Sequence, residues 1–234
     1  MRFVACLMML SLIYSCKKGE IKRIPVKSEW KGKVKTVKTG TDYFYKVHHF
    51  DTAGNDTAIY IYGNNNKLIT KATYKFDVNN YLLSSESFST SNNIVYYSNC
   101  TYSEDWTERT ETYSSSHVAV KYDDRQFVQD TKGNLLAEYV LKGDTKVFMT
   151  KNTYDTTSNF LIKTEQFSEG CTITYTNDEH GNPVIAKYDY PKEKKSDTKN
   201  IAYVYDSKGN WIEKTEKSDL SNAVIKEKSI IEYY

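Results

Sequence analysis

The sequence predicts an all-β fold, an antiparallel meander of repeated β-hairpins that forms a curled, largely single sheet. Residues that favour strands are abundant, and they include 21 tyrosines. Turn sequences containing Asp recur about every two dozen residues, which is typical of a repeat architecture. Apolar and polar residues alternate after these turns, as in half-buried strands. The alternative is a two-sheet sandwich or a partly closed barrel, because long sheets curl or split.

The overall composition excludes nucleic acid as a partner. The 234 residues carry a formal charge of +2, and the basic residues are mixed with acidic ones along the chain. A nucleic-acid-binding protein needs a basic face that releases counterions. The hydrophobic fraction is 39%, and tyrosine makes up a large part of it. A tyrosine can bury its ring while its hydroxyl keeps contact with water. We therefore expect a thin core with many half-exposed rings.

The N-terminus predicts export from the cytoplasm. A helix over the apolar segment Phe3–Tyr14 would be roughly 18 Å long, short of the roughly 30 Å hydrocarbon core of a bilayer. With Arg2 before it, the segment is better interpreted as a signal peptide than as a membrane span. It ends Ile13-Tyr14-Ser15-Cys16, which resembles the bacterial lipobox.

The lipobox resemblance implies a lipoprotein with three parts. Residues 1–15 would be the signal peptide, residues 16–30 a lipid-anchored tether that begins at Cys16, and residues 31–234 the β domain. Several acyl chains, palmitate among them, would hold Cys16 stably in a membrane. We expect a cell-envelope protein of the outer membrane, with the periplasmic or the surface side left open. The alternative is an ordinary secretory signal with Cys16 as an incidental thiol.

Two further cysteines remain in the expected mature chain, Cys100 and Cys171. An oxidising compartment permits a disulfide between them. The alternative is two half-buried thiols on separate strands, and spacing along the sequence leaves both alternatives open.

Each repeat contains an aromatic residue, an Asp, two spacers, a Gly, Asn or Ser, and an Asn before apolar residues. The Asp carboxylate is expected to accept hydrogen bonds from amides two or three residues on, and Gly, Asn79 or Ser158 to supply the left-handed residue. A degenerate copy at Tyr102–Trp106 fills the one double gap in the spacing. The predicted turn residues are Asp51, Gly54, Asn55, Asp77, Asn80, Asp130, Gly133, Asn134, Asp155, Asn159, Asp178, Gly181, Asn182, Asp206, Gly209 and Asn210.

Aromatic residues stand one or three positions before these turns, and such positions share one face of a strand. They are Tyr74, Phe76, Tyr102, Phe127, Tyr175, Tyr203 and Tyr205.

The copy Tyr203-Val-Tyr-Asp-Ser-Lys-Gly-Asn-Trp-Ile resembles the YD (tyrosine–aspartate) repeats of RHS and teneurin-type β-shells, and the resemblance covers residues 43–213. It implies neighbouring hairpins that pair into one curled sheet, here of roughly a dozen strands. Large shells of this family enclose a toxin, and this chain is too short to close such a cavity.

No catalytic or nucleotide-binding motif is present in the sequence. His48 and His49 would point to opposite faces of a strand, and turn chemistry alone explains Asp178 beside Glu179 and His180. We expect no metal, no cofactor and no enzymatic activity.

Thr52, Thr57 and Thr156 are candidate O-glycosylation positions. Each follows an Asp and precedes a small residue or Thr, which resembles the O-glycosylation sequon of some exported bacterial proteins.

We interpret the chain as a non-catalytic envelope lipoprotein whose repeat sheet binds a glycan or a protein. Trp106 and Trp211 are the candidate binding rings, and the alternative role of such rings is cross-strand packing. A structural or assembly component that pairs through exposed sheet edges is the second hypothesis. An enzyme with an unrecognised site is the third.

Overall fold

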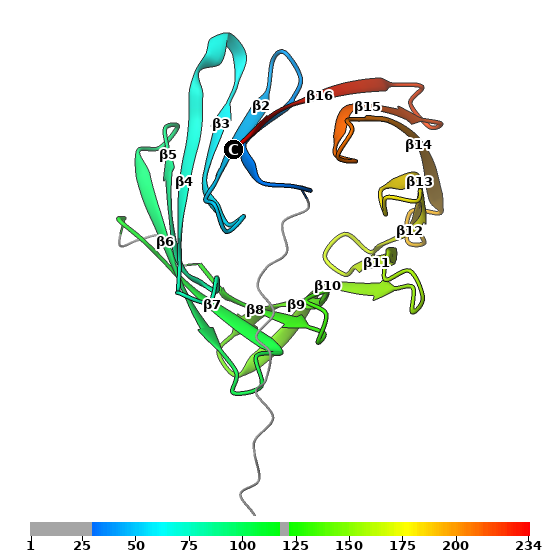
Figure 1. The fold of residues 1–234 in the computed structure, drawn as a ribbon. Coiled ribbons are helices and arrows are strands. Elements are labelled where there is room, and N and C mark those ends of the chain that lie inside the picture. Colours follow the sequence, from blue (N-terminus) through cyan, green and yellow to red (C-terminus); the bar gives the residue numbers. More distant parts are fainter. Residues whose placement is uncertain (1–29, 118–121) are drawn as a thin grey trace, which may run out of the picture.

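The protein forms a closed antiparallel β-barrel, seen in a computed structural model that describes residues 30–117 and 122–234 (Figure 1). Every strand pairs with its neighbours in sequence, and the last strand pairs with the first. The strands are β1 (Val34–Gly40), β2 (Tyr45–Phe50), β3 (Asp56–Tyr62), β4 (Leu68–Phe76), β5 (Leu82–Ser89), β6 (Ile94–Tyr102), β7 (Glu108–Ser115), β8 (Asp124–Gln129), β9 (Leu135–Lys142), β10 (Thr145–Tyr154), β11 (Leu161–Gln166), β12 (Cys171–Asn177), β13 (Pro183–Tyr190), β14 (Lys195–Tyr205), β15 (Trp211–Ser218) and β16 (Val224–Tyr233), with one 3-10 turn, η1 (Asn64–Asn66).

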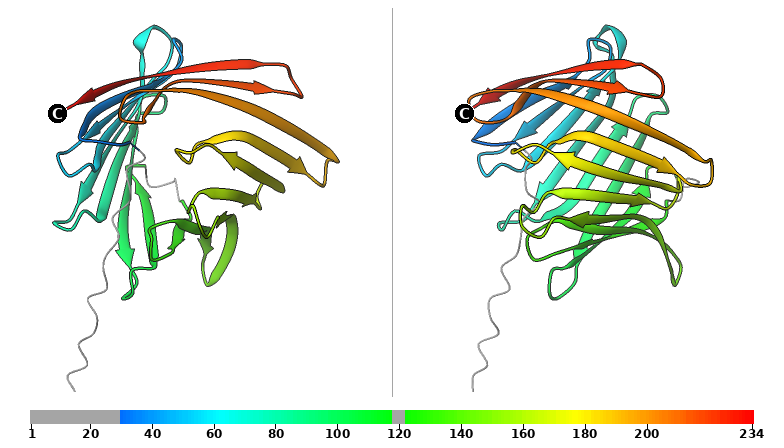
Figure 2. Two further views of the ribbon diagram at one scale, coloured as in Figure 1. Left: turned by 45° about the vertical axis from the view of Figure 1, so that its right-hand side comes forward. Right: turned by 90° about the vertical axis from the view of Figure 1, so that its right-hand side faces the viewer.

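The predicted all-β antiparallel meander is confirmed. The main prediction of a curled, largely single sheet is wrong because the sheet closes into a barrel, which is nearer to the alternative of a partly closed barrel. The sheet closes on itself through β1 and β16, where Val37 lies opposite Ile231 and Thr39 opposite Ser229. The strands run obliquely around the barrel wall (Figure 2). Closure satisfies the backbone groups that an open sheet would leave unpaired at its two edges. Every second hairpin lacks the Asp turn signature, so the repeat underestimated how many strands were available to close the ring.

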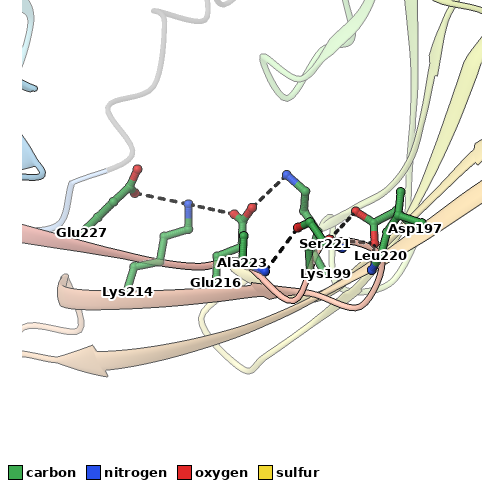
Figure 3. A network of polar contacts seen from close by, with 9 residues as sticks. Asp197, Lys199, Lys214, Glu216, Leu220, Ser221, Ala223 and Glu227 are labelled. Atoms are coloured by element: carbon green, nitrogen blue, oxygen red, sulfur yellow. Dashed lines mark hydrogen bonds and ion pairs between the residues drawn. The ribbon is translucent and has the colours of Figure 1, made fainter.

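The two faces of the wall differ in their side chains. Lys199, Lys214, Glu216 and Glu227 point into the barrel from β14, β15 and β16 (Figure 3). Side chains alternate along a strand, so their neighbours in sequence point outward. On β16 the outward residues Lys226, Lys228, Ile230 and Glu232 are all exposed. Cross-strand pairing carries this assignment of an inner and an outer face around the whole barrel.

Two small clusters of buried apolar residues lie on the inner wall. One lies at the seam between the first and last strands, where Val34, Val37 and Phe50 are buried. The other is formed by Cys171, Ile173 and Ala186 on β12 and β13. Tyrosine rings extend both clusters, which agrees with the thin, tyrosine-rich core expected from composition.

The predicted Asp turns all lie at one end of the barrel, because a meander returns to the same end after every second strand. We call this end the turn rim. It consists of the turns at residues 51–55, 77–81, 103–107, 130–134, 155–160, 178–182 and 206–210. No helix within residues 30–117 and 122–234 is long and apolar enough to cross a membrane.

Candidate functional site

The Asp of each standard turn accepts hydrogen bonds from two backbone amides. Asp51 Oδ1 accepts from Ala53 N and Asn55 N, each at 2.9 Å, and Gly54 adopts a φ of +90°. The second amide lies four residues on, rather than the two or three expected from the sequence. A left-handed residue three positions after the Asp is readily accommodated by glycine. The same geometry recurs at Asp130, Asp178 and Asp206.

In two turns the left-handed residue is not the one that the repeat pattern predicted. After Asp77 it is Asn80, with φ of +65°, and Asn79 is the residue before it. The turn at Asp155 is one residue longer and has Asn159 at φ +61°, while Ser158 donates its amide to the Asp carboxylate at 2.6 Å. Asn tolerates the left-handed region better than most residues with a side chain, which explains why it takes this position twice.

The degenerate copy uses a different anchor. Ser103 occupies the place of the Asp, because its hydroxyl accepts the amide of Glu108 at 3.0 Å. Trp106 is the left-handed residue, with φ of +60°. Asp105 accepts from Ser103 Oγ at 2.7 Å and from Thr107 N at 3.1 Å, so it supports the turn from within.

A tyrosine from the following repeat closes the turn before it. Tyr205 donates its hydroxyl hydrogen to Asp178 Oδ2, and Asn182 Nδ2 donates to the Tyr205 hydroxyl oxygen at 2.9 Å. The tyrosine and the aspartate of the repeat motif therefore meet between neighbouring repeats. We call this three-residue unit a clasp. A second clasp joins Tyr233, Asp206 and Asn210.

Other neighbouring turns are joined by asparagine pairs. Asn55 Nδ2 donates to Asn80 Oδ1 at 2.9 Å, and Asn134 Nδ2 donates to Asn159 Oδ1 at 2.8 Å. Clasps and asparagine pairs thus link several, but not all, of the neighbouring turns along the rim, in addition to the strand ladders.

The barrel seam is held at the same rim. The side chain of Asn210 accepts from Lys31 N at 2.6 Å and donates to Lys31 O at 2.8 Å. The ring of Trp30 packs on that of Trp211, with centroids 5.6 Å apart. The start of the described chain is thereby fixed to the last Asp turn. Cys16 and most of the predicted tether lie outside the described residues.

The two candidate binding tryptophans both contact other aromatic rings. The Trp106 centroid lies 4.6 Å from Tyr81 and 4.8 Å from Tyr102, and Trp211 contacts Tyr203 at 6.4 Å as well as Trp30. These contacts join neighbouring strands and turns. A binding role for either tryptophan stays a prediction.

The three candidate glycosylation threonines differ in accessibility. Thr52 and Thr156 are exposed in the turns after Asp51 and Asp155. Thr57 is half-buried, and its hydroxyl donates to the carbonyl oxygen of His49 at 3.0 Å. Modification of Thr57 would have to break that bond, so the first two sites are the better candidates.

The histidines of the sequence are separated or paired with other groups. His48 Nδ1 lies 2.5 Å from Asp56 Oδ2, whereas the adjacent His49 packs against the Tyr60 ring on the other face. His180 Nδ1 is 3.2 Å from Lys31 Nζ. In the part of the chain that the structure describes, no group of three or more His, Cys, Asp or Glu is placed to hold a metal ion.

Cys100 and Cys171 are both free thiols, on β6 and β12. Burial raises the pKa of Cys100 to about 11, and Cys171 is only 2% exposed. A half-buried thiol with a raised pKa, such as Cys100, and a thiol closed off from solvent, such as Cys171, both react slowly. We expect both to react with Ellman's reagent only after unfolding, and the mass of the native mature protein to be unchanged by reductant. Rapid labelling of the native protein, or a mass gain on reduction, would contradict this.

Tyrosine side chains line the inner wall near the turn rim, as the shared strand face predicts. The hydroxyls of Tyr102 and Tyr154 donate to the carbonyls of Leu82 at 2.9 Å and Leu135 at 3.2 Å. Burial raises the pKa of Tyr102 and that of Tyr203 to about 12. Several of these rings are thus committed to the wall through both packing and hydrogen bonds.

Charged side chains on the inner wall form a row of ion pairs (Figure 3). Lys199 Nζ lies 2.8 Å from Glu216 Oε1, while Lys214 Nζ lies 3.5 Å from Glu216 Oε2 and 3.3 Å from Glu227 Oε2. Burial raises the pKa of Glu216, but the hydrogen bonds from the two lysines outweigh it and the net shift is downward. This row neutralises itself and leaves little charge for a ligand.

A hollow on the outer wall has the opposite character. Two rows of outward residues cross β4, β5, β6 and β7, and Glu86 lies opposite both Thr73 and Tyr97. In the second row Ser84 lies opposite Lys75 and Asn99. The small side chains in the middle leave a cavity of about 380 Å³, which we call the outer groove. It is lined by Thr73, Lys75, Ser84, Ser85, Glu86, Tyr97, Ser98, Asn99 and Ser114.

A second cavity of about 290 Å³ continues the outer groove along the strands. It shares Thr73 and Glu86 with the first cavity and adds Lys71, Phe88 and Val95. The extension therefore contributes an apolar surface beside the polar part.

Sequence reasoning did not find the outer groove, because the groove depends on register across four strands. Its one sequence signal is the serine-rich strand β5, Leu82–Ser89, whose small side chains cannot fill the wall. The clasps had a clearer signal, since Tyr205 follows Asp178 and Tyr233 follows Asp206 at the same separation in the sequence.

No family model and no curated protein matches the chain. Among solved structures, a porin-like protein from Bacteroides uniformis ATCC 8492 superposes with a TM-score of 0.53 at 10% identity, covering 85% of this chain and 96% of that one. A TcdB2-TccC3 structure without its hypervariable C-terminal region gives a TM-score of 0.39 at 14% identity over 75% of this chain. The Photorhabdus luminescens Tc holotoxin pore gives a TM-score of 0.31 at 12% identity over 77%.

The chain spans only 10% and 11% of the two toxin chains. RHS-repeat toxins are therefore weak structural neighbours, and their superposition carries no argument about the fold. The likeness to the porin-like protein shows the fold alone, a β-barrel that the two chains share.

Proposed function

We propose that the protein is a non-catalytic cell-envelope lipoprotein, anchored through Cys16, that holds its barrel in an aqueous compartment and binds a ligand on the barrel wall. Each of β1 to β16 is paired on both sides along at least part of its length, so the described residues leave no complete strand edge open for pairing. Strand addition, the second hypothesis from the sequence, would therefore be limited to short unpaired stretches such as residues 145–148 of β10. Ligand binding by side chains is the function that the wall supports best.

The outward side chains support a barrel in water. On β15 they include Glu213, Thr215 and Lys217, and on β16 the lysines at 226 and 228. A barrel that spans a bilayer carries an outward apolar band about 25 Å tall. On β15 and β16 these charged side chains separate the exposed Val224 and Ile230, so the two strands form no continuous apolar band, which fits a domain that a lipid chain tethers beside the membrane.

The outer groove is the observation that carries the binding proposal. Some charged side chains elsewhere on the barrel form close ion pairs, as in Arg109–Glu111 at 2.9 Å and Arg125–Glu138 at 2.7 Å. Within the described ranges, the side chains of Lys75, Glu86, Tyr97 and Asn99 have neither a hydrogen bond nor an ion pair. Polar groups gathered in a hollow without partners of their own are suited to contact a ligand.

The make-up of the outer groove favours binding over catalysis. Its titratable side chains are Lys71, Lys75, Glu86 and Tyr97. General acid–base hydrolysis of the glycosidase type needs two carboxylates, and nucleophilic catalysis needs a nucleophile with a base. One carboxylate between two lysines provides neither arrangement.

Fractionation of cells that express the full chain tests the envelope assignment. We expect the wild-type protein in the membrane fraction, with globomycin causing an unprocessed precursor to accumulate. Cys16→Ser should abolish acylation, so that no processed protein is found in the membrane fraction. Cys100→Ser is the matched control and should keep the wild-type distribution. Acyl-independent membrane association or unchanged processing would contradict the proposal.

A further inference from the structure

We propose that the outer groove between β4 and β7 is a binding site for a neutral, hydroxyl-rich saccharide. This inference rests on the proposed binding function and names its ligand class. Four features carry it: the unpaired donors and acceptors, the balance of charge, the exposed tyrosine ring and the continuation of the groove along the strands.

The unpaired groups include both hydrogen-bond donors and hydrogen-bond acceptors. The Lys75 ammonium donates, the Glu86 carboxylate accepts, and the Asn99 amide does both. A sugar hydroxyl can donate and accept at once, so adjacent hydroxyls on one ring can satisfy all three groups. Because the floor is made of Ser84 and Thr73, the ring can approach the sheet closely.

The charge in the outer groove selects against strongly charged ligands. Glu86 is common to both cavities, with Lys75 in one and Lys71 in the other. A polyanion that bound either lysine would be repelled by the Glu86 carboxylate beside it. A polycation would be repelled by the two lysines. Such mismatches exclude the wrong class of ligand even where contacts to the right one are modest.

An aromatic ring stands at the edge of this polar set. Tyr97 is 39% exposed on the outer wall, and Glu86 lies directly across the strand from it. The ring face can pack against the C–H face of a pyranose while the carboxylate accepts from its hydroxyls. The tyrosines of the inner wall near the turn rim are instead packed, and several are hydrogen-bonded.

The length of the outer groove favours a chain of sugars over a single one. Rows of outward residues on a strand are spaced by about 7 Å. Three such rows line the combined cavity, represented on β5 by Ser84, Glu86 and Phe88. The apolar surface of Phe88 and Val95 would lie under a second sugar ring.

Calorimetric titration of the mature protein tests the site with maltohexaose, cellohexaose, xylohexaose and mannohexaose as probes, and with heparin as the polyanion. We expect saturable binding of at least one neutral oligosaccharide. Tyr97→Ala and Glu86→Gln should each weaken it by about tenfold or more. The matched controls are Tyr43→Ala, at a ring 74% exposed on the β1–β2 turn, and Glu104→Gln on the β6–β7 turn, which should bind as the wild type does. Unchanged circular dichroism in all four variants shows that folding is intact.

Failure of this inference can be told apart from failure of the proposed function. If no neutral oligosaccharide binds, if heparin alone binds, or if binding survives Tyr97→Ala, the saccharide site is overturned. The acylation and fractionation results are measured without sugar and stand or fall independently. Binding lost equally in Tyr97→Ala and Tyr43→Ala would also overturn the site, because it would place the ligand elsewhere.

Discussion

Tyr205→Phe should lower the free energy of unfolding by about 1–2 kcal/mol, because it removes the hydroxyl that joins two repeats. That hydroxyl donates to Asp178 and accepts from Asn182. The phenylalanine keeps the ring and its packing against His180, where the centroids are 4.3 Å apart. The loss therefore reports the clasp and not the aromatic contact. Equilibrium unfolding in urea, followed by tyrosine and tryptophan fluorescence, measures it.

Asp178→Ala should lower the free energy of unfolding further, by about 2–3 kcal/mol, because the carboxylate stabilises its own turn as well as the clasp. It accepts the amides of His180 and Asn182 at 2.9 Å each, in addition to the tyrosine hydroxyl. The two substitutions should be non-additive, since both remove the same bond. The double variant should be less destabilised than the sum of the two single variants.

Tyr203→Phe is the matched control for the clasp. Tyr203 lies two residues earlier on the same face of β14, and its burial is the main cause of its raised pKa, with no hydrogen bond among the causes. Its substitution should leave the free energy of unfolding nearly unchanged. Equal losses in Tyr203→Phe and Tyr205→Phe, or full additivity of the two clasp substitutions, would show that the tyrosine–aspartate bond does not join the repeats.

The sequence predicted what is local in this fold, namely the strand type, the Asp turns and the shared face of the aromatic residues. A turn such as Asp51–Asn55 is determined within five residues, so its pattern can be recognised directly. The two turns that were misaligned, at Asp77 and Asp155, differ in having no glycine, and the position of their left-handed Asn depends on local backbone geometry.

Closure and the outer groove depend on contacts between distant segments. Lys31 and Asn210 are 179 positions apart in the sequence, and no local pattern indicates that they are hydrogen-bonded. Glu86 and Tyr97 come together only because β5 and β6 adopt one register, and a one-residue shift of either strand would turn its own side chain to the inner wall. The repeat motif predicts the turns that join the strands at the turn rim. The proposed ligand site lies on a part of the wall that the motif does not describe.

Raising the pH through the tyrosine range should unfold the barrel cooperatively between about pH 10 and 12. Burial raises the pKa of Tyr102 and Tyr203 to about 12, against about 10 in an unfolded chain. Burial also raises the pKa of Tyr74, Tyr154 and Tyr175. A group whose pKa is raised by folding stabilises the folded state fully below its unfolded pKa, and this contribution is lost as the pH rises through the folded pKa.

The ultraviolet absorbance of tyrosinate and circular dichroism, recorded on the same samples, measure this transition. We expect a delayed, steep rise in tyrosinate absorbance that coincides with the loss of β structure, because the inner-wall rings cannot ionise until the wall opens. Tyr102→Phe and Tyr203→Phe should each make the free energy of unfolding less dependent on pH above about pH 10. Tyr43→Phe, at a ring 74% exposed, is the control and should leave that dependence unchanged. Gradual ionisation of all tyrosines in a protein that keeps its β structure would show that the inner-wall rings are open to water, and that the clasps and packed rings do not hold the wall closed.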